Sequence, residues 1–194
     1  MPMGRLNVSM KDDVIRMLEE LAEQTGKTVS SIVSESASLY IESLQMGLRT
    51  EDVIRAFKIM SIIKEIDAVP VPSRLLDFLI TASTRANEEE ALAKWYERGL
   101  VVGNILRKYA PDIRHLAQFI NANRALIPLD LFEVSEDRDR ITVIVSGVGY
   151  SRESAKSTAE GLKGLLKAFG YEVVESEFSE GFVKVTSTPP SEEA

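Results

Sequence analysis

The stretch Arg5-Leu6-Asn7-Val8-Ser9-Met10 decides how the rest of the chain is interpreted. Its residues alternate strictly, with apolar side chains at the even positions and Arg, Asn and Ser at the odd positions. Because successive side chains of a strand point to opposite faces, this pattern predicts a half-buried β-strand. One strand and the two short helices that follow it bury too little apolar surface to fold alone. The stretch therefore predicts half of an obligate homodimer.

Two helical patterns follow the predicted strand and are separated by Gly26. The first, from about Asp12 to Thr25, begins with two acidic residues, which favour the positive end of a helix. Thr28 is a good N-cap for the second, from about Val29 to Gln45. Each pattern repeats its apolar residues at helical spacing. The apolar positions are Val14, Met17, Leu18 and Leu21 in the first helix, and Ile32, Val33, Ala37, Tyr40 and Leu44 in the second.

Together, RLNVSM and the following DDVIRMLEELAEQTGKTVSSIVSESASLYIE resemble the ribbon-helix-helix repressor family, to which Arc, MetJ and CopG belong. The resemblance covers roughly residues 4–44. It is carried by a combination of features: the alternating strand, the acidic helix start, the glycine turn before a basic residue and Thr, and a second apolar helix. The family implies that strands from two subunits pair antiparallel into a ribbon that enters the major groove of DNA.

The same resemblance implies which residues contact DNA. The polar face of the strand would present Arg5, Asn7 and Ser9 to the bases, since Arg suits guanine and Asn suits adenine. Leu6, Val8 and Met10 would enter the dimer core. The N-terminus of the second helix offers free amides, which bind phosphate. The residues expected to contact phosphate are Lys11, Lys27, Thr28, Val29, Ser30 and Ser31.

The charge balance limits the strength of such binding. The whole chain carries a formal net charge of −7. Residues 1–48 contain Arg5, Lys11, Arg16 and Lys27 against the acidic residues Asp12, Asp13, Glu19, Glu20, Glu23, Glu35 and Glu42. Affinity from counterion release scales with the number of phosphates neutralised. We therefore expect modest affinity per dimer and several dimers side by side on one operator. In the alternative interpretation, the ribbon-helix-helix unit serves only to dimerise the chain.

The remainder of the chain predicts an α+β domain. Four helical patterns precede Pro128, and the apolar period then changes from about 3.6 to 2. The expected helices are about 50–67, 72–83, 87–109 and 111–121, followed by strands 129–134 and 140–148, a helix 151–169, and strands 171–178 and 182–186. Local hairpins favour a largely antiparallel sheet with a helix on one face. We therefore divide the chain into residues 1–48, residues 49–188 and a polar tail, residues 189–194, that we expect to be disordered.

This second domain, at most about Ser73 to Thr186, is similar to the ligand-sensing domains of the haem-nitric-oxide-binding and vinyl-reductase-like group. The similarity is carried by the element order and by GLKGLLKAFGYEVVESEFSEGFVKVT. Cofactors of that group depend on histidine or cysteine, whereas this chain has no cysteine and only His115. We therefore expect no metal or other cofactor. What carries over is an apolar pocket for a small molecule.

Composition excludes several classes of protein. An apolar fraction of 44% and a charged fraction of 27% are ordinary for a globular domain. The sequence contains no apolar run long enough to span a membrane and no signal-peptide pattern at its start. Together with the absence of cysteine, this favours a cytoplasmic protein.

The sequence also shows no combination of nucleophile, base and orienting group, so we do not expect an enzyme. It predicts a homodimeric DNA-binding transcriptional regulator whose second domain senses an effector or oligomerises. The alternative is a protein-interaction module, like an antitoxin or a scaffold.

Overall fold

The structure is a computed structural model that describes residues 7–123, 129–137, 140–147 and 151–189. Contacts within the chain divide it into two compact units, Met1–Phe57 and Lys58–Ala194, called unit 1 and unit 2 below. The division expected from the sequence, after residue 48, falls just before helix α3 (Thr50–Glu65). The division by contacts falls within that helix.

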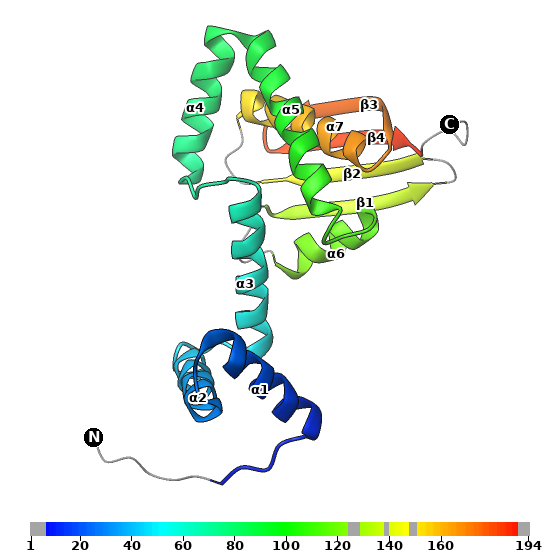
Figure 1. The fold of residues 1–194 in the computed structure, drawn as a ribbon. Helices are drawn as coiled ribbons and strands as arrows, with labels where there is room; N and C mark the ends of the chain where they lie inside the picture. Colours follow the sequence, from blue (N-terminus) through cyan, green and yellow to red (C-terminus); the bar gives the residue numbers. More distant parts are fainter. Residues whose placement is uncertain (1–6, 124–128, 138–139, 148–150, 190–194) are drawn as a thin grey trace. The chain divides into compact units, whose positions relative to one another are not determined.

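Unit 1 contains helices α1 (Asp12–Thr25) and α2 (Val29–Gln45), as the sequence predicts (Figure 1). Gly26 ends α1 with a φ of 67°, in the left-handed region that glycine adopts without strain. The Thr28 hydroxyl accepts a hydrogen bond from the Ser31 amide at 3.1 Å and so caps α2. These two signals lie within three residues of each other, which explains why the turn could be predicted from the sequence.

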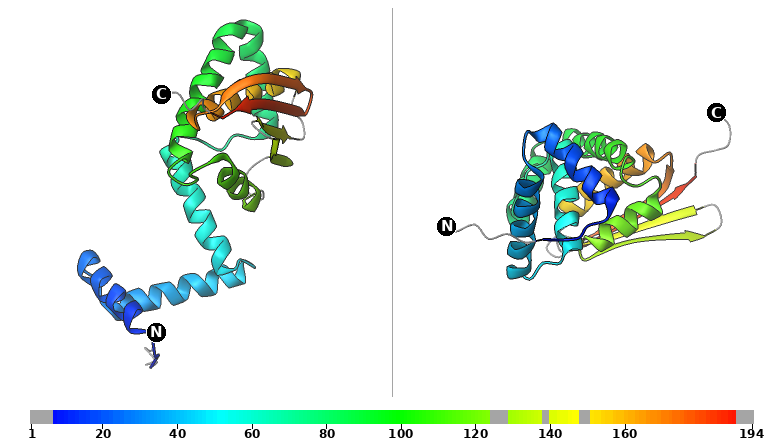
Figure 2. Two further views of the ribbon diagram at one scale, coloured as in Figure 1. Left: turned by 90° about the vertical axis from the view of Figure 1, so that its right-hand side faces the viewer. Right: turned by 60° about the horizontal axis from the view of Figure 1, so that its bottom comes forward.

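The expected N-terminal strand is not found in the part of unit 1 that the structure describes. Asn7–Met10 form an extended segment that leads into α1 without pairing to another strand (Figures 1 and 2). Arg5 and Leu6 lie outside the described residues. A strand requires a hydrogen-bonded neighbour. A ribbon strand would receive that neighbour from a second subunit, so a single chain cannot show the ribbon.

Unit 2 contains helices α4 (Ser73–Ala86), α5 (Glu88–Leu106), α6 (Ile113–Ala122) and α7 (Arg152–Ala168). The last three begin at local capping residues that the sequence offers. The side chains of Asn87, Asp112 and Ser151 accept hydrogen bonds from amides in the first turns of α5, α6 and α7. Helix α4 is longer than expected. Helix α5 is shorter, because the chain turns at residues 107–110 ahead of Pro111.

The four strands form one antiparallel sheet, which confirms the mixed α+β class. They are β1 (Leu131–Asp137), β2 (Arg140–Ser146), β3 (Glu172–Ser179) and β4 (Phe182–Thr188), in the order β1-β2-β4-β3. The two hairpins therefore join through their inner strands. In this register Val143 lies opposite both Val134 and Val185, which places these valines on one face of the sheet.

Helices α6 and α7 cover that face and build the core of unit 2. Ile113 and Leu116 of α6 and Leu166 of α7 are completely buried, with Val143 and Val185 of the sheet. The uncovered face of the sheet is polar, and Lys184 of β4 pairs there with Glu177 of β3 at 2.7 Å. Burial of one face only is what the alternating strand pattern predicts.

Glycines let the backbones of α5 and α7 come into direct contact. A Cβ atom added to Gly99 would lie 2.0 Å from the carbonyl oxygen of Gly161, and one added to Gly164 would lie 2.1 Å from that of Tyr96. At Gly103 it would lie 2.6 Å from the Cβ of Ala168. The structure therefore explains the paired glycines as helix-to-helix packing inside one chain.

No helix in the described ranges is long and apolar enough to cross a membrane.

Candidate functional site

The N-terminal segment leaves its predicted base-contacting residues open to solvent. Asn7 and Ser9 are exposed, and Arg5 lies outside the described residues. Val8, predicted to face the dimer core, is 58% exposed, and Met10 is half-buried. The segment therefore has an uncovered apolar side as well as an uncovered polar side.

The residues predicted to bind phosphate gather at the N-terminus of α2. Thr28 takes the amide of Ser31, and the first amides of a helix, here those of Val29 and Ser30, have no partner within the helix. Lys27 lies directly before the cap. The structure thus brings together residues 27–31, which we call the α2 cradle. Lys11 is exposed at the start of α1 and belongs to the other helix.

The cation of the α2 cradle, Lys27, forms an ion pair with a carboxylate of the same unit. The Nζ atom of Lys27 lies 2.6 Å from Oε2 of Glu35, and the Ser31 hydroxyl donates to Oε1 of Glu35 at 3.2 Å. The hydrogen bond from Lys27, and to a smaller extent that from Ser31, hold the pKa of Glu35 below its ordinary value. The sequence argument missed this contact, although Ser31 and Glu35 stand four residues apart on one helix face.

Unit 1 has almost no core of its own within its described residues. Helix α1 contains no buried residue, and α2 buries only Ile32 and Ser43. Val14, Met17 and Leu21 are between 41% and 67% exposed and line a groove of about 400 Å³ along α1. Further exposed apolar side chains of α2 are Leu39, Tyr40, Ile41 and Leu44. The described part of unit 1 therefore exposes apolar side chains that monomeric proteins usually cover.

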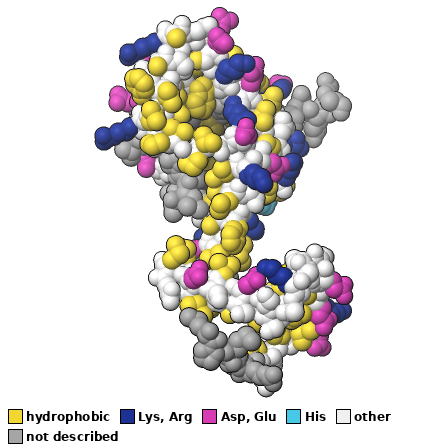
Figure 3. All heavy atoms as spheres, turned by 60° about the vertical axis from the view of Figure 1, so that its left-hand side comes forward, with side chains coloured by type: hydrophobic (Ala, Val, Ile, Leu, Met, Phe, Trp, Pro, Cys, Tyr) yellow, Lys and Arg dark blue, Asp and Glu magenta, His cyan; other side chains and the backbone are white. Residues whose placement is uncertain are grey.

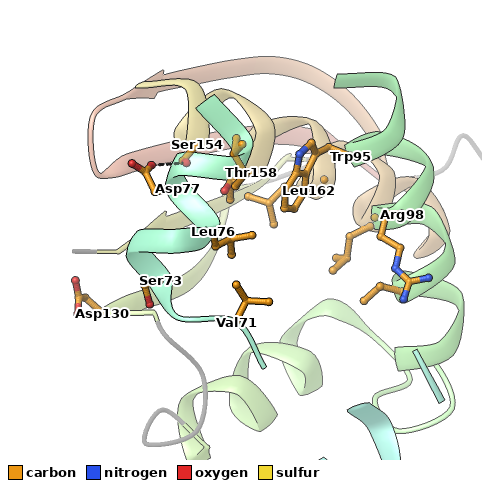
Figure 4. A pocket seen from close by; sticks show the side chains of 15 residues that line it. Val71, Ser73, Leu76, Asp77, Trp95, Arg98, Asp130, Ser154, Thr158 and Leu162 are labelled. Atoms are coloured by element: carbon orange, nitrogen blue, oxygen red, sulfur yellow. Dashed lines mark hydrogen bonds between the residues drawn. The ribbon is translucent and has the colours of Figure 1, made fainter. Parts of the chain in front are cut away.

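Unit 2 contains an apolar pocket of about 530 Å³ bordered by α4, α5 and α7. Figure 3 shows apolar side chains gathered around a hollow on this face, and Figure 4 shows the pocket from close by. Leu76 of α4, Trp95 of α5 and Leu162 of α7 supply much of the apolar lining. The volume lies within the range of roughly 300–1,000 Å³ that small-molecule sites occupy.

Polar groups stand at opposite sides of this pocket. Asp77 of α4 accepts hydrogen bonds from the Ser154 hydroxyl at 2.6 Å and from the Ser151 amide at 3.0 Å, which tie α4 to the N-terminus of α7. These bonds, that from Ser154 first, keep the pKa of Asp77 below its ordinary value. The Arg98 guanidinium lies across the pocket from Asp77 (Figure 4). No ion-pair partner of Arg98 is found among the described residues.

His115 lies on the polar face of α6, as its position in the sequence predicts. Its Nδ1 atom is 2.8 Å from Oδ2 of Asp112, and its side chain is 57% exposed. Within the ranges that the structure describes, no group of three or more His, Cys, Asp or Glu residues could hold a metal ion. The pair lies apart from the residues that line the apolar pocket.

No model of a known protein family matches this sequence, and a search of curated proteins finds no match to it either. The functional argument therefore depends on the geometry of units 1 and 2.

Proposed function

We propose that this chain is a sequence-specific DNA-binding transcriptional regulator that acts as a cytoplasmic homodimer. Two N-terminal segments pair into an antiparallel ribbon, which enters the major groove and presents Arg5, Asn7 and Ser9 of each subunit to the bases. The α2 cradle of each subunit holds a backbone phosphate. Unit 2 is the effector or oligomerisation domain.

One observation carries this proposal: unit 1 has two helices, α1 and α2, joined by a short turn, but almost no buried residues among those that the structure describes. If about 60 Å² of apolar surface on each of Val14, Met17, Leu21 and Tyr40 were covered, the gain at roughly 25 cal/mol per Å² would be about 6 kcal/mol per subunit. That is comparable with the whole stability of a small domain. A second copy, which carries the same surface, covers it symmetrically. The unpaired segment before α1 would gain its strand neighbour in the same step.

A titration of wild-type protein onto DNA from its own promoter region tests the proposal. Wild type shifts this DNA, and Asn7→Ala combined with Arg5→Ala abolishes the shift while the protein remains a dimer in sedimentation. Arg16→Ala, on α1, is a matched control that removes the same charge outside the predicted ribbon. Wild-type protein that shifts no DNA would overturn the proposal.

A second function is favoured by the ion pair between Lys27 and Glu35. Because the cation of the α2 cradle is already paired, and because residues 1–48 carry more acidic than basic side chains, unit 1 could serve only to dimerise the chain. In that case the protein is an interaction module, and unit 2 binds a protein partner. Salt separates the two functions, since phosphate contacts make DNA affinity fall steeply between 50 and 200 mM salt. A dimer held by apolar side chains does not weaken in that range.

A further inference from the structure

The pocket between α4, α5 and α7 has an unusual distribution of charge. Asp77 of α4 and Arg98 of α5 both line it, and Oδ1 of Asp77 accepts hydrogen bonds from Ser151 and Ser154 at the N-terminus of α7. A helix N-terminus also stabilises a carboxylate through its dipole. Arg98 carries a charge for which the described residues supply no ion-pair partner, and it lines the same pocket. The exposed Arg98 is therefore the cation that the helical walls of this pocket offer to a ligand, whereas Asp77 is already engaged through Oδ1.

The walls near Arg98 suit an apolar body. Trp95 stands one helical turn before Arg98 on α5 and faces the pocket, where Leu76 and Leu162 face it from α4 and α7 (Figure 4). Gly161 presents only backbone here, and even an added Cβ would lie 3.7 Å from the Trp95 ring. At about 30 Å³ per water, the pocket holds the equivalent of roughly 18 waters. Their displacement by an apolar ligand is favourable.

We propose that this pocket binds a small amphipathic carboxylate. The apolar body, of roughly ten carbons, lies against Trp95, Leu76 and Leu162, and the carboxylate receives hydrogen bonds from the Arg98 guanidinium. Asp130 also lines the pocket, but Figure 4 shows it on the far side from Arg98. Asp130 would therefore lie near the apolar end of the bound ligand, away from its carboxylate. This inference deepens the proposed function by naming the effector. Only its regulatory consequence rests on that function, because ligand binding to unit 2 does not require DNA.

Trp95 makes the proposal directly measurable, since it is the single tryptophan of the chain. The full-length protein is titrated with decanoate, decanol and decylamine, which share one chain length and differ in charge. We expect a saturable change of tryptophan fluorescence with decanoate, and binding of decanol that is about three to ten times weaker, as for a partly exposed charged hydrogen bond. Equal or tighter binding of decanol or decylamine, or no saturable change with any of the three, would overturn the proposal.

Two variants locate the site. Arg98→Gln should weaken decanoate binding about three- to tenfold and leave decanol binding unchanged. Arg85→Gln, on the exposed surface of α4 away from the pocket lining, should change neither. Thr158→Phe fills the pocket from α7 and should abolish decanoate binding while the circular dichroism spectrum is retained. Unchanged decanoate affinity in Arg98→Gln or in folded Thr158→Phe contradicts the assignment.

The main competitor for the pocket is a second copy of the chain, because α4 also exposes Leu75, Phe78 and Leu79. If a second copy covers the pocket, the fluorescence of Trp95 without ligand should depend on protein concentration, and decanoate should not bind. This result would overturn the carboxylate proposal. A DNA shift measured in parallel keeps the two proposals apart. Decanoate binding without a DNA shift supports the pocket and rejects the regulator. A DNA shift without decanoate binding does the reverse.

Discussion

Two alanine substitutions on helix α7 should change stability in opposite directions. Gly161 and Gly164 are one turn apart on the same helix, and the same methyl group is added to both. At Gly164 the new Cβ would lie 2.1 Å from the Tyr96 carbonyl oxygen and 2.8 Å from the Leu100 amide nitrogen. At Gly161 the nearest atoms are 3.7 Å away, which is ordinary contact.

These distances set the magnitudes. Non-bonded contacts are favourable at about 3.5–4.0 Å, so Gly164→Ala must push α5 and α7 apart by about 1 Å or more. Overpacking of this kind costs roughly 1–3 kcal/mol or more, whereas alanine gains about 1 kcal/mol over glycine inside a helix. Because the clash involves rigid backbone, we expect Gly164→Ala to destabilise unit 2 by about 2 kcal/mol net. Gly161→Ala has the favourable helix propensity of alanine without a clash, so it should stabilise unit 2 by about 0.5–1 kcal/mol.

Urea unfolding followed by circular dichroism measures both changes. All samples are compared at one protein concentration, because the proposed dimerisation would make apparent stability depend on it. The midpoint should fall for Gly164→Ala and rise for Gly161→Ala, with an unchanged slope, which indicates that the same surface is exposed on unfolding. If Gly164→Ala is as stable as wild type, or if the midpoints of both variants shift in the same direction, α5 and α7 do not meet backbone to backbone as described.

Three further predictions concern single side chains. Glu35→Gln releases Lys27 in the α2 cradle, so DNA affinity at 0.1 M salt should rise about two- to fivefold in a gel-shift titration; unchanged affinity would remove the cradle from the interface. Asp77→Asn should cost about 1–2 kcal/mol in urea unfolding at pH 7. The folded-state pKa of Asp77 is depressed, so its contribution is present above the unfolded pKa, and the difference from wild type should shrink below about pH 4. A difference independent of pH would show that the charge of Asp77 does not matter. Met17→Glu places a charge on the exposed apolar surface of α1 and should yield monomers in sedimentation at micromolar concentration, whereas we expect wild type to be a dimer; dimeric Met17→Glu would move the interface elsewhere.

Local signals explain what could be predicted from the sequence. The ends of α1 and α2 follow from Gly26 and Thr28, which determine the backbone within a few residues. The start of α7 at Ser151 follows in the same way. The change of apolar period after Pro128 was enough to predict an antiparallel sheet.

What could not be predicted depends on contacts between distant segments. The pocket takes its walls from residues 71–80, 95–102 and 154–165, and no local pattern shows that these segments meet. The pairing of β2 with β4, which joins the two hairpins, is likewise invisible to hairpin rules. The proposed N-terminal ribbon was predicted from a local alternating pattern, but its strand pairing would need a second chain, which a single folded chain cannot display. The contact between α5 and α7 depends on Gly99 meeting Gly161 from a distant helix, and only the folded chain shows that they meet.

The glycine contact also determines which wall of the pocket can move. At Gly99, Gly161 and Gly164, helices α5 and α7 meet backbone to backbone, and a glycine has no side chain that could change rotamer and absorb a displacement. The backbones of Trp95 and Arg98 on α5 are therefore tied closely to that of Leu162 on α7. Helix α4 is attached differently, through the hydrogen bonds of Asp77 to the start of α7. Of the helices that border the pocket, α4 is therefore the one that could shift without separating the backbones of α5 and α7.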